Sequence, residues 1–204
     1  EIWVNDNWCK EQLLKLNVSS RKISVVGNPV LEKITKRNKK PATDFNQLIF
    51  ISEEMKSDFI NLKDNYGFDE FEVIKFILNH KPNDLSVAIK LHPSEKVLKY
   101  NSILDQHNVK IVNVVKDDLP SSACYVGMNS ILLLELALKG EKVYTFRPNA
   151  KTKFIGNELG LTFDLNEDKL IELVTSKKHL HFDIPTLDFK GSIKKINHRI
   201  MELL

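Results

Sequence analysis

The sequence predicts an α/β protein built on a Rossmann-like, doubly wound parallel sheet with helices on both faces. Short apolar runs of strand length alternate along the chain with longer segments whose apolar residues recur at helical spacing. The runs are apolar at almost every position, a pattern typical of strands buried on both faces of a sheet. Because strand and helix alternate, we expect parallel strands with the helices as crossovers.

The first part of the chain predicts two strands and two helices in alternation. We expect them over residues 2–4, 8–16, 23–26 and 30–34. The basic run 36–40 follows and ends at Pro41. Like-charged segments that end in proline are typical of solvated linkers, so we place a domain boundary between residues 38 and 39.

The second domain, residues 39–204, predicts five further strands with helices between them. We expect the strands over residues 48–51, 87–91, 109–115, 124–126 and 143–146. We expect the helices over residues 69–79, 97–105, 130–138, 165–174 and 192–204. Gly140 ends one of these helices, and Asn166 is placed to cap the start of another. Residues 119–123 predict a loop or a short helical turn.

Composition and charge exclude several classes of function. The net charge is only +3 over 204 residues, which argues against a nucleic-acid partner. No apolar run reaches the roughly 18 residues that a membrane span needs. Cys9 and Cys124 are far apart and make neither a disulfide framework nor a zinc cluster, which indicates a reducing, cytoplasmic setting. Residue 1 is not Met and residues 1–4 indicate a strand, so we expect the chain to begin within a longer protein.

Polar residues follow the predicted strands at the edge where ligands bind in open parallel sheets. In chain order they are Ser52 and Glu53, then His92, Pro93 and Ser94, then residues 127–130, then Arg147. The set contains one histidine, with no second His or Cys at metal-ligand spacing. We therefore expect an anion site, and no metal, at this edge.

Gly127 begins a strand-to-helix turn that includes Asn129 and Ser130. Glycine allows a tight turn and a close approach of the backbone to a ligand. Asn129 or Ser130 is expected to cap the following helix, whose free N–H groups and dipole attract a phosphate. A capped turn without any ligand explains the same residues, so both interpretations stay open.

Pro93 restricts His92 to extended backbone and aims its imidazole over the edge of the sheet. From there the ring can donate to a phosphate oxygen or offset the charge of a leaving group. The alternative is a histidine that ends a strand without a function.

Glu135 lies inside the apolar helix predicted over residues 130–138. A buried carboxylate needs partners, and ribose hydroxyls can supply them. Alternatively, Glu135 faces solvent or pairs with Lys139 four residues later.

Three segments together resemble the second half of GT-B glycosyltransferases. Residues 25–30 (VVGNPV) look like the segment that closes the first domain in that superfamily. Residues 90–93 (KLHP) are similar to the HP motif of bacterial sialyltransferases and polysialyltransferases, and to a motif of CDP-glycerol glycerophosphotransferases. Residues 127–143, which include Ser130 and Glu135, look like the donor-site helix and the strand after it.

The resemblance implies a role for each matching residue. Glu135 would bind the ribose of the donor, and His92 would also be the residue that acts on the leaving phosphate. The residues expected at or near the donor phosphate are Ser52, His92, Pro93, Gly127, Asn129 and Ser130. The first domain, which in that superfamily binds the acceptor and supplies the base, is missing apart from a remnant at residues 1–38. The sequence therefore leaves open whether this chain alone catalyses transfer.

The leading hypothesis is transfer of a sugar from a CMP- or CDP-activated donor to a bacterial surface glycan. The expected partners are the nucleotide sugar, bound as substrate without a further cofactor, and a glycan acceptor at the cytoplasmic face of a membrane. Peripheral association with that membrane is expected, and a nucleic-acid partner is not. The alternative enzyme is of the UDP-GlcNAc 2-epimerase type, which shares the fold and a similar Ser-to-Glu helix. A nonenzymatic α/β binding domain is the third hypothesis.

Overall fold

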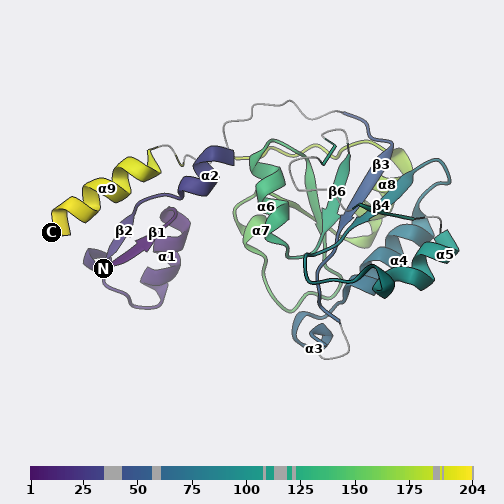
Figure 1. Cartoon of the computed structure of the whole chain (residues 1–204), viewed down its shortest axis with the longest axis horizontal. Helices are drawn as coiled ribbons and strands as arrows, with labels where there is room; N and C mark the ends of the chain where they lie inside the picture. The colour runs from purple at the N-terminus through teal and green to yellow at the C-terminus, as the bar shows by residue number, and fades with distance from the viewer. Residues whose placement is uncertain are drawn as a thin grey trace. The chain divides into compact units, whose positions relative to one another are not determined.

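A computed structural model of the chain describes most of its residues (Figure 1). These are residues 1–34, 43–56, 61–107, 109–112, 119–120, 123–185, 189 and 191–203. The chain forms two compact units. Unit 1 comprises Glu1–Asn38 and Thr186–Leu204, and unit 2 comprises Lys39–Pro185.

Unit 2 is built on a six-stranded parallel sheet of order β5-β4-β3-β6-β7-β8. The strands are β3 (Gln47–Ile51), β4 (Ser86–Lys90), β5 (Lys110–Val112), β6 (Cys124–Gly127), β7 (Val143–Phe146) and β8 (Phe163–Leu165). The order runs outward from β3 in one direction and from β6 in the other, which defines a doubly wound sheet. The predicted fold class is thereby confirmed.

Helices cover both faces of this sheet. They are α3 (Lys63–Tyr66), α4 (Glu70–His80), η2 (Val97–Tyr100), α5 (Asn101–His107), α6 (Ile131–Leu138), α7 (Ile155–Glu158) and α8 (Glu167–Ser176). Helices α4, α5 and α8 lie on one side of the sheet, and α6 and α7 lie on the other (Figure 1).

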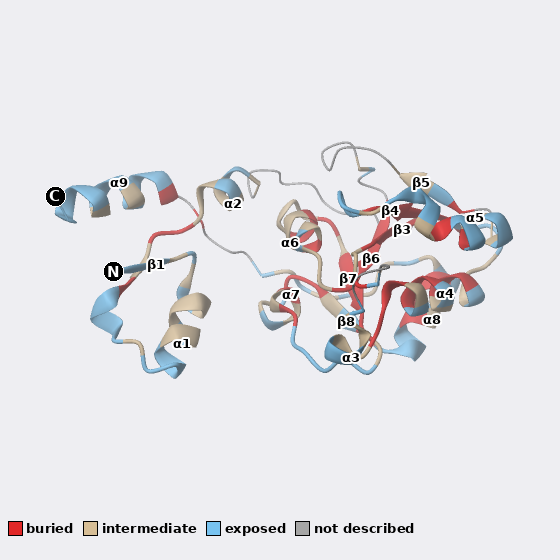
Figure 2. Cartoon of the chain, turned by 60° about the horizontal axis from the view of Figure 1, so that its bottom comes forward, coloured by how far each residue is buried: buried red, intermediate tan, exposed pale blue. Residues whose placement is uncertain are grey.

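The core of unit 2 lies between the sheet and helices α4 and α8. Strands β6 and β7 are buried at every position, as expected for central strands covered on both faces (Figure 2). On β3, Leu48 and Phe50 point into the main hydrophobic cluster, which also holds Ile74 of α4 and Leu173 of α8. Full burial of such side chains stabilises the fold by about 1.5–3 kcal/mol each.

The helix ends follow local capping rules. Asp69 accepts from the Glu72 N–H at 2.9 Å while the Glu72 side chain accepts from the Asp69 N–H, which makes a capping box at the start of α4. Asn166 caps α8 as predicted, with its side chain accepting from the Lys169 N–H at 2.9 Å.

Several elements differ from the sequence expectations. The helix expected over 97–105 starts as the 3-10 turn η2, and the strand expected over 109–115 ends at Val112 within the described residues. The short elements α3, α7 and β8 were not expected. The helix expected from residue 165 starts at Glu167, because Leu165 belongs to β8. The linker expected over 36–40, residues 113–118 and part of the 119–123 segment lie outside the described residues.

Unit 1 is a small βαβ arrangement. Strands β1 (Ile2–Val4) and β2 (Ile23–Val25) pair in parallel, connected through α1 (Asn7–Lys15) and the 3-10 turn η1 (Ser20–Lys22). Helices α2 (Pro29–Ile34) and α9 (Ser192–Leu203) complete the unit. Of the described residues, no helix in either unit is long and apolar enough to cross a bilayer.

Helix α9 belongs to unit 1, whereas the sequence analysis assigned it to the domain 39–204. The reason is a specific cap: the Glu32 carboxylate of α2 accepts from the backbone N–H groups of Gly191 and Ser192, at 3.0 and 3.1 Å. A carboxylate at a helix N-terminus is favoured by the helix dipole. A boundary near residue 185 therefore exists in addition to the expected one near residue 38.

Candidate functional site

A cavity of about 810 Å³ opens in unit 2 at the carboxyl ends of β3 and β4 and beside the start of α6. Its walls come from the segments that follow β3 and β4 and from α6. The lining residues are Ile51, Ser52, Glu53, Glu54, Met55, Leu62, Tyr66, Lys90, Leu91, His92, Pro93, Ser94, Ser130, Ile131, Leu132 and Glu135. The cavity thus brings together Ser52, His92, Pro93, Ser130 and Glu135 of the sequence-predicted set.

Gly127 and Asn129 are not among the residues that line this cavity. Gly127 is the last residue of β6, pairs with Ile51 and Thr145, and does not have a positive φ. A Cβ at this position would lie 3.0 Å from the Leu133 methyl groups and 3.1 Å from the Ile51 carbonyl oxygen. Glycine here allows α6 to pack closely on the sheet, which differs from the expected tight turn with close approach to a ligand.

His92 is exposed at the cavity, in a turn held by Glu95. The His92 N–H donates to Glu95 Oε2 at 2.8 Å, and the Glu95 N–H donates to the His92 carbonyl at 2.9 Å. The His92 Nδ1 accepts from the Ser94 N–H at 3.3 Å and lies 2.7 Å from Ser94 Oγ. A backbone N–H can only donate, so Nδ1 is the acceptor and the neutral ring carries its proton on Nε2. The Nε2–H is then a donor for a ligand in the cavity.

Ser52 lies under the His92–Pro93 turn and is only 1% exposed. Its hydroxyl donates to Glu95 Oε1 at 2.8 Å and also contacts the Tyr100 hydroxyl. Ser52 therefore supports the turn through Glu95, and its hydroxyl is committed to that network. Burial raises the pKa of Tyr100, so the phenol stays protonated in this network.

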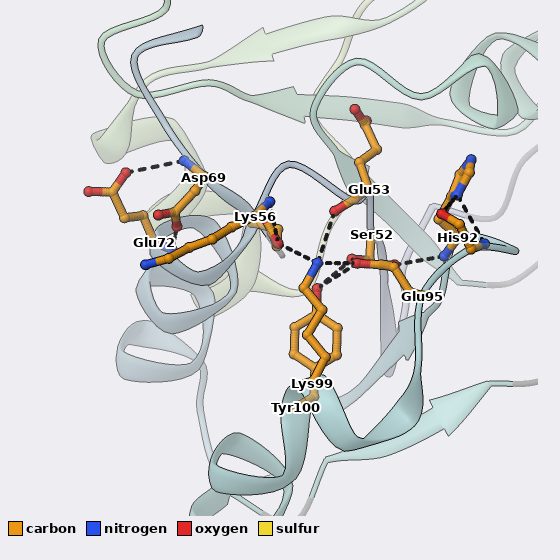
Figure 3. Close-up of polar contacts among 11 residues, drawn as sticks. Ser52, Glu53, Lys56, Asp69, Glu72, His92, Glu95, Lys99 and Tyr100 are labelled. Atoms are coloured by element: carbon orange, nitrogen blue, oxygen red, sulfur yellow. Dashed lines mark hydrogen bonds and ion pairs between the residues drawn. The ribbon is translucent and has the colours of Figure 1, made fainter. Parts of the chain in front are cut away.

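Lys99 joins two buried carboxylates, those of Glu70 and Glu95, and Figure 3 labels Lys99 and Glu95. Its Nζ lies 2.6 Å from Glu95 Oε1 and also contacts Glu70 Oε1, and both carboxylate side chains are fully buried. The same Nζ lies 5.6 Å from the ring centroids of Phe71 and Tyr100. Burial raises the pKa of Glu70, and the Lys99 charge partly offsets that effect.

Glu53, just after β3, makes a polar contact with the start of α6 that the sequence does not predict. Its Oε1 accepts from the Asn129 N–H at 2.6 Å, and the Ser130 N–H also lowers the pKa of this carboxylate. Burial raises the pKa of Glu53 to about 7, although the two N–H bonds act in the opposite direction. The available signal was its place directly after Ser52, among the residues that follow the strands.

Arg147 follows β7 and is 7% exposed. Its guanidinium donates to the carbonyl and the hydroxyl of Thr152, and burial lowers its pKa while the charges of Asp164 and Glu53 raise it. In the described part of the chain, the buried Arg147 Nε has no hydrogen-bond partner, and neither do the two buried amide atoms of Asn129.

Helix α6 presents its first turn and Glu135 to the cavity. Ser130 is its N-cap, with the hydroxyl accepting from the Leu132 N–H at 3.3 Å. Glu135 lines the cavity from the same helix. Among the described residues, no group of three or more His, Cys, Asp or Glu is placed to hold a metal ion. The arrangement offers a hydrogen-bond donor at His92, the positive end of the α6 dipole, whose N–H groups already donate to Glu53 and Ser130, and an acceptor at Glu135.

Comparison of the chain with protein-family models and with curated proteins gives no match. Among solved structures, it is similar to the Methanocaldococcus jannaschii UDP-GlcNAc 2-epimerase in complex with UDP-GlcNAc and UDP, with 19% identity and a TM-score of 0.58 over 100% of this chain and 61% of that one. Another structure of that epimerase gives 18% identity and a TM-score of 0.55 over 99% and 62%. The Thermosulfurimonas dismutans KpsC, a beta Kdo 2,7 transferase, is 16% identical, with a TM-score of 0.47 over 93% of this chain and 53% of that one.

This chain spans less than two thirds of the length of those proteins. The two epimerase structures show that the fold is shared, in agreement with the α/β Rossmann-like class predicted from the sequence.

Proposed function

We propose that this chain is the donor-binding half of a GT-B glycosyltransferase and that its cavity binds the nucleotide of a nucleotide sugar. The observation that carries the proposal is the meeting of the His92–Pro93 turn and the N-terminus of α6 at one cavity. Its volume of about 810 Å³ lies within the roughly 300–1,000 Å³ of small-molecule sites.

The chemistry of sugar transfer fits the donors in this cavity. As the bond between the sugar and the phosphate breaks, negative charge grows on the phosphate oxygen that leaves. Donors aimed at that oxygen stabilise the charge, and they do so best when held in advance. His92 Nε2–H, fixed by Ser94, and the positive end of the α6 dipole are such groups. Glu135 then accepts from the ribose hydroxyls.

The HP resemblance favours a CMP- or CDP-activated donor, and a bacterial surface glycan made at the inner face of the membrane as acceptor. The nucleotide sugar is bound as a substrate. In this proposal the acceptor and the catalytic base come from a further domain of the whole protein.

A reaction of the UDP-GlcNAc 2-epimerase type is the second candidate, and the structural similarity to that enzyme favours it. The two candidates differ in the nucleotide they predict. Thermal unfolding with millimolar CMP, CDP or UDP separates them. Stabilisation by CMP or CDP supports the proposed transferase, and stabilisation by UDP alone supports the epimerase or a transferase that uses a UDP sugar. If none of the three nucleotides stabilises the protein, both are wrong.

His92→Ala tests the proposed phosphate contact. Loss of a hydrogen bond to a charged group costs about 1.5–3 kcal/mol, so we expect nucleotide affinity to fall about 10- to 100-fold by calorimetry. The unfolding temperature should stay unchanged because His92 is exposed. His181→Ala, at another exposed histidine that does not line the cavity, serves as the matched control. Full-strength binding by His92→Ala would refute the role of His92.

A further inference from the structure

The N-terminus of α6 already holds an anion that belongs to the protein itself. The Glu53 carboxylate accepts from the Asn129 N–H at 2.6 Å, and the neighbouring Ser130 N–H lowers its pKa; both backbone donors precede the first turn of the helix. Glu53 also lines the cavity, so its carboxylate lies where a ligand phosphate would meet the helix. Backbone N–H groups at a helix N-terminus bind carboxylates and phosphates alike.

A carboxylate and a phosphate cannot both accept from these two donors. Two like charges in hydrogen-bond reach of the same donors repel each other, and more strongly in a drier site. Either the phosphate stays away from the helix end, or Glu53 gives up its charge when the phosphate arrives.

The surroundings of Glu53 favour loss of its charge. Burial raises its pKa to about 7, and the carboxylates of Glu95, after β4, and of Glu70, on α4, raise it further. Two cations lie nearby: Lys99 Nζ is 3.5 Å from the Glu53 carbonyl oxygen, and the Arg147 charge acts on Glu53 from the end of β7. Lys99 is already paired with Glu70 and Glu95. Figure 3 shows the Glu53 side chain pointing away from Lys99.

Two further buried groups lack hydrogen-bond partners in the described part of the chain, although neither residue lines the cavity. Both amide atoms of Asn129 are buried and make no hydrogen bond, and the Nε of Arg147, a residue only 7% exposed, makes none either. The Asn129 amide belongs to the residue whose backbone N–H donates to Glu53, and amide groups are suitable partners for phosphate oxygens.

We propose that Glu53 occupies the phosphate position in the empty site, and that binding of a nucleotide phosphate there transfers one proton from solvent to the Glu53 carboxylate. The inference rests on the proposed function. The neutral acid gives up the N–H groups of Asn129 and Ser130 to the phosphate. Its new O–H can in turn donate to a phosphate oxygen. Only one proton is transferred in this step, and no covalent bond to the ligand forms or breaks.

Proton uptake makes nucleotide affinity depend on pH. Above the pKa of Glu53 the empty site is ionised, and binding must include the free energy of protonation. With a pKa of about 7, affinity is expected to fall about tenfold between pH 6 and pH 8. Glu53→Gln keeps the size of the side chain but removes the charge, and should therefore remove this dependence.

The experiment is calorimetry on the full chain in pairs of buffers that differ in ionisation enthalpy, which gives the number of protons taken up. The probe is the 5′-monophosphate methyl ester of the nucleoside that binds, because its single charge does not change between pH 6 and pH 8. Wild-type protein should take up about one proton at pH 8 and close to none at pH 6. Glu53→Gln should take up none at either pH and bind at pH 8 about as tightly as the wild type at pH 6.

The control is Glu54→Gln, which removes the adjacent cavity-lining carboxylate and should leave the proton uptake intact. Binding by the wild type without proton uptake and with equal affinity at both pH values would overturn this inference and leave the proposed function standing. That wild-type measurement decides the question even if Glu53→Gln does not fold. Absence of binding in every protein at both pH values would overturn the proposed function, and this inference with it.

Discussion

Lys99 carries the positive charge between two buried carboxylates, and its replacement tests how much this charge stabilises unit 2. Glu70 and Glu95 are fully buried at their side chains, and each contacts Lys99 Nζ. Lys99→Met keeps most of the apolar stem over the rings of Phe71 and Tyr100 while it removes the charge. Both carboxylates would then lose a cation in a site from which water is excluded.

The expected loss of stability is large. Removal of one partner from a buried ion pair costs about 3–5 kcal/mol, because the remaining charge stays desolvated. The Glu70 pKa is already raised by burial, and loss of Lys99 raises it further. Protonation removes the uncompensated charge of the carboxyl. The loss of unfolding free energy should therefore be greatest above pH 7 and should shrink as the pH falls toward 5.

Urea unfolding, followed by near-ultraviolet circular dichroism, measures the loss of unfolding free energy of unit 2. All four tyrosines lie in unit 2, whereas Trp3 and Trp8 lie in unit 1, so the tyrosine signal reports on the unit that contains the site. Lys177→Met is the matched control, because Lys177 pairs with Asp84 at the surface and should lose only about 0–1 kcal/mol. The reasoning is refuted if Lys99→Met and Lys177→Met lose the same free energy at pH 7.5, or if the Lys99→Met loss grows toward pH 5.

Three other substitutions test the backbone and the acid stability of unit 2. Gly67 has a φ of +91°, and a Cβ there would lie 2.1 Å from the Asn149 carbonyl oxygen, so Gly67→Ala should lose clearly more than the roughly 1–2 kcal/mol of left-handed backbone alone. Gly160→Ala, with a φ of +69° and only Pro185 contacts at 3.6 Å, should lose no more than that amount in the same urea assay; equal losses would contradict the packing argument. Burial lowers the pKa of His179 to about 4, so stability should fall as the pH falls from about 6.5 to 4, where the unfolded chain takes up the proton first. His179→Phe should flatten the unfolding free energy against pH in that window, and an unchanged slope would show that His179 is not its source.

The central strands and the main helices of unit 2 were predictable because their buried positions are mostly apolar in the sequence. Strand β7 coincides with the predicted run 143–146, since all its side chains are buried and apolar or nearly so. Helix α4 follows its predicted range within one residue, because the Asp69 capping box defines its start. The edge strand β8 has only three residues, one of them Asp164, and leaves too short a pattern to separate it from a loop.

The candidate site was predictable in position but not in its internal bonds. Strand ends indicated Ser52, His92 and Ser130, and all three line one cavity. The sequence did not indicate that Ser52 bonds to Glu95 or that Glu53 reaches Asn129, because these pairs lie 43 and 76 residues apart. Such contacts depend on the order of the strands in the sheet, which no local pattern records.

The cap that Glu32 places on α9 has a consequence for how the protein is made. Unit 1 needs residues from both ends of the chain, since the Gly191 and Ser192 N–H groups meet a carboxylate about 160 positions earlier. A ribosome releases the first strand and helix long before α9 exists, while residues 39–185 can fold as a continuous stretch in the meantime. Unit 1 can therefore be completed only after the whole of unit 2 has been synthesised.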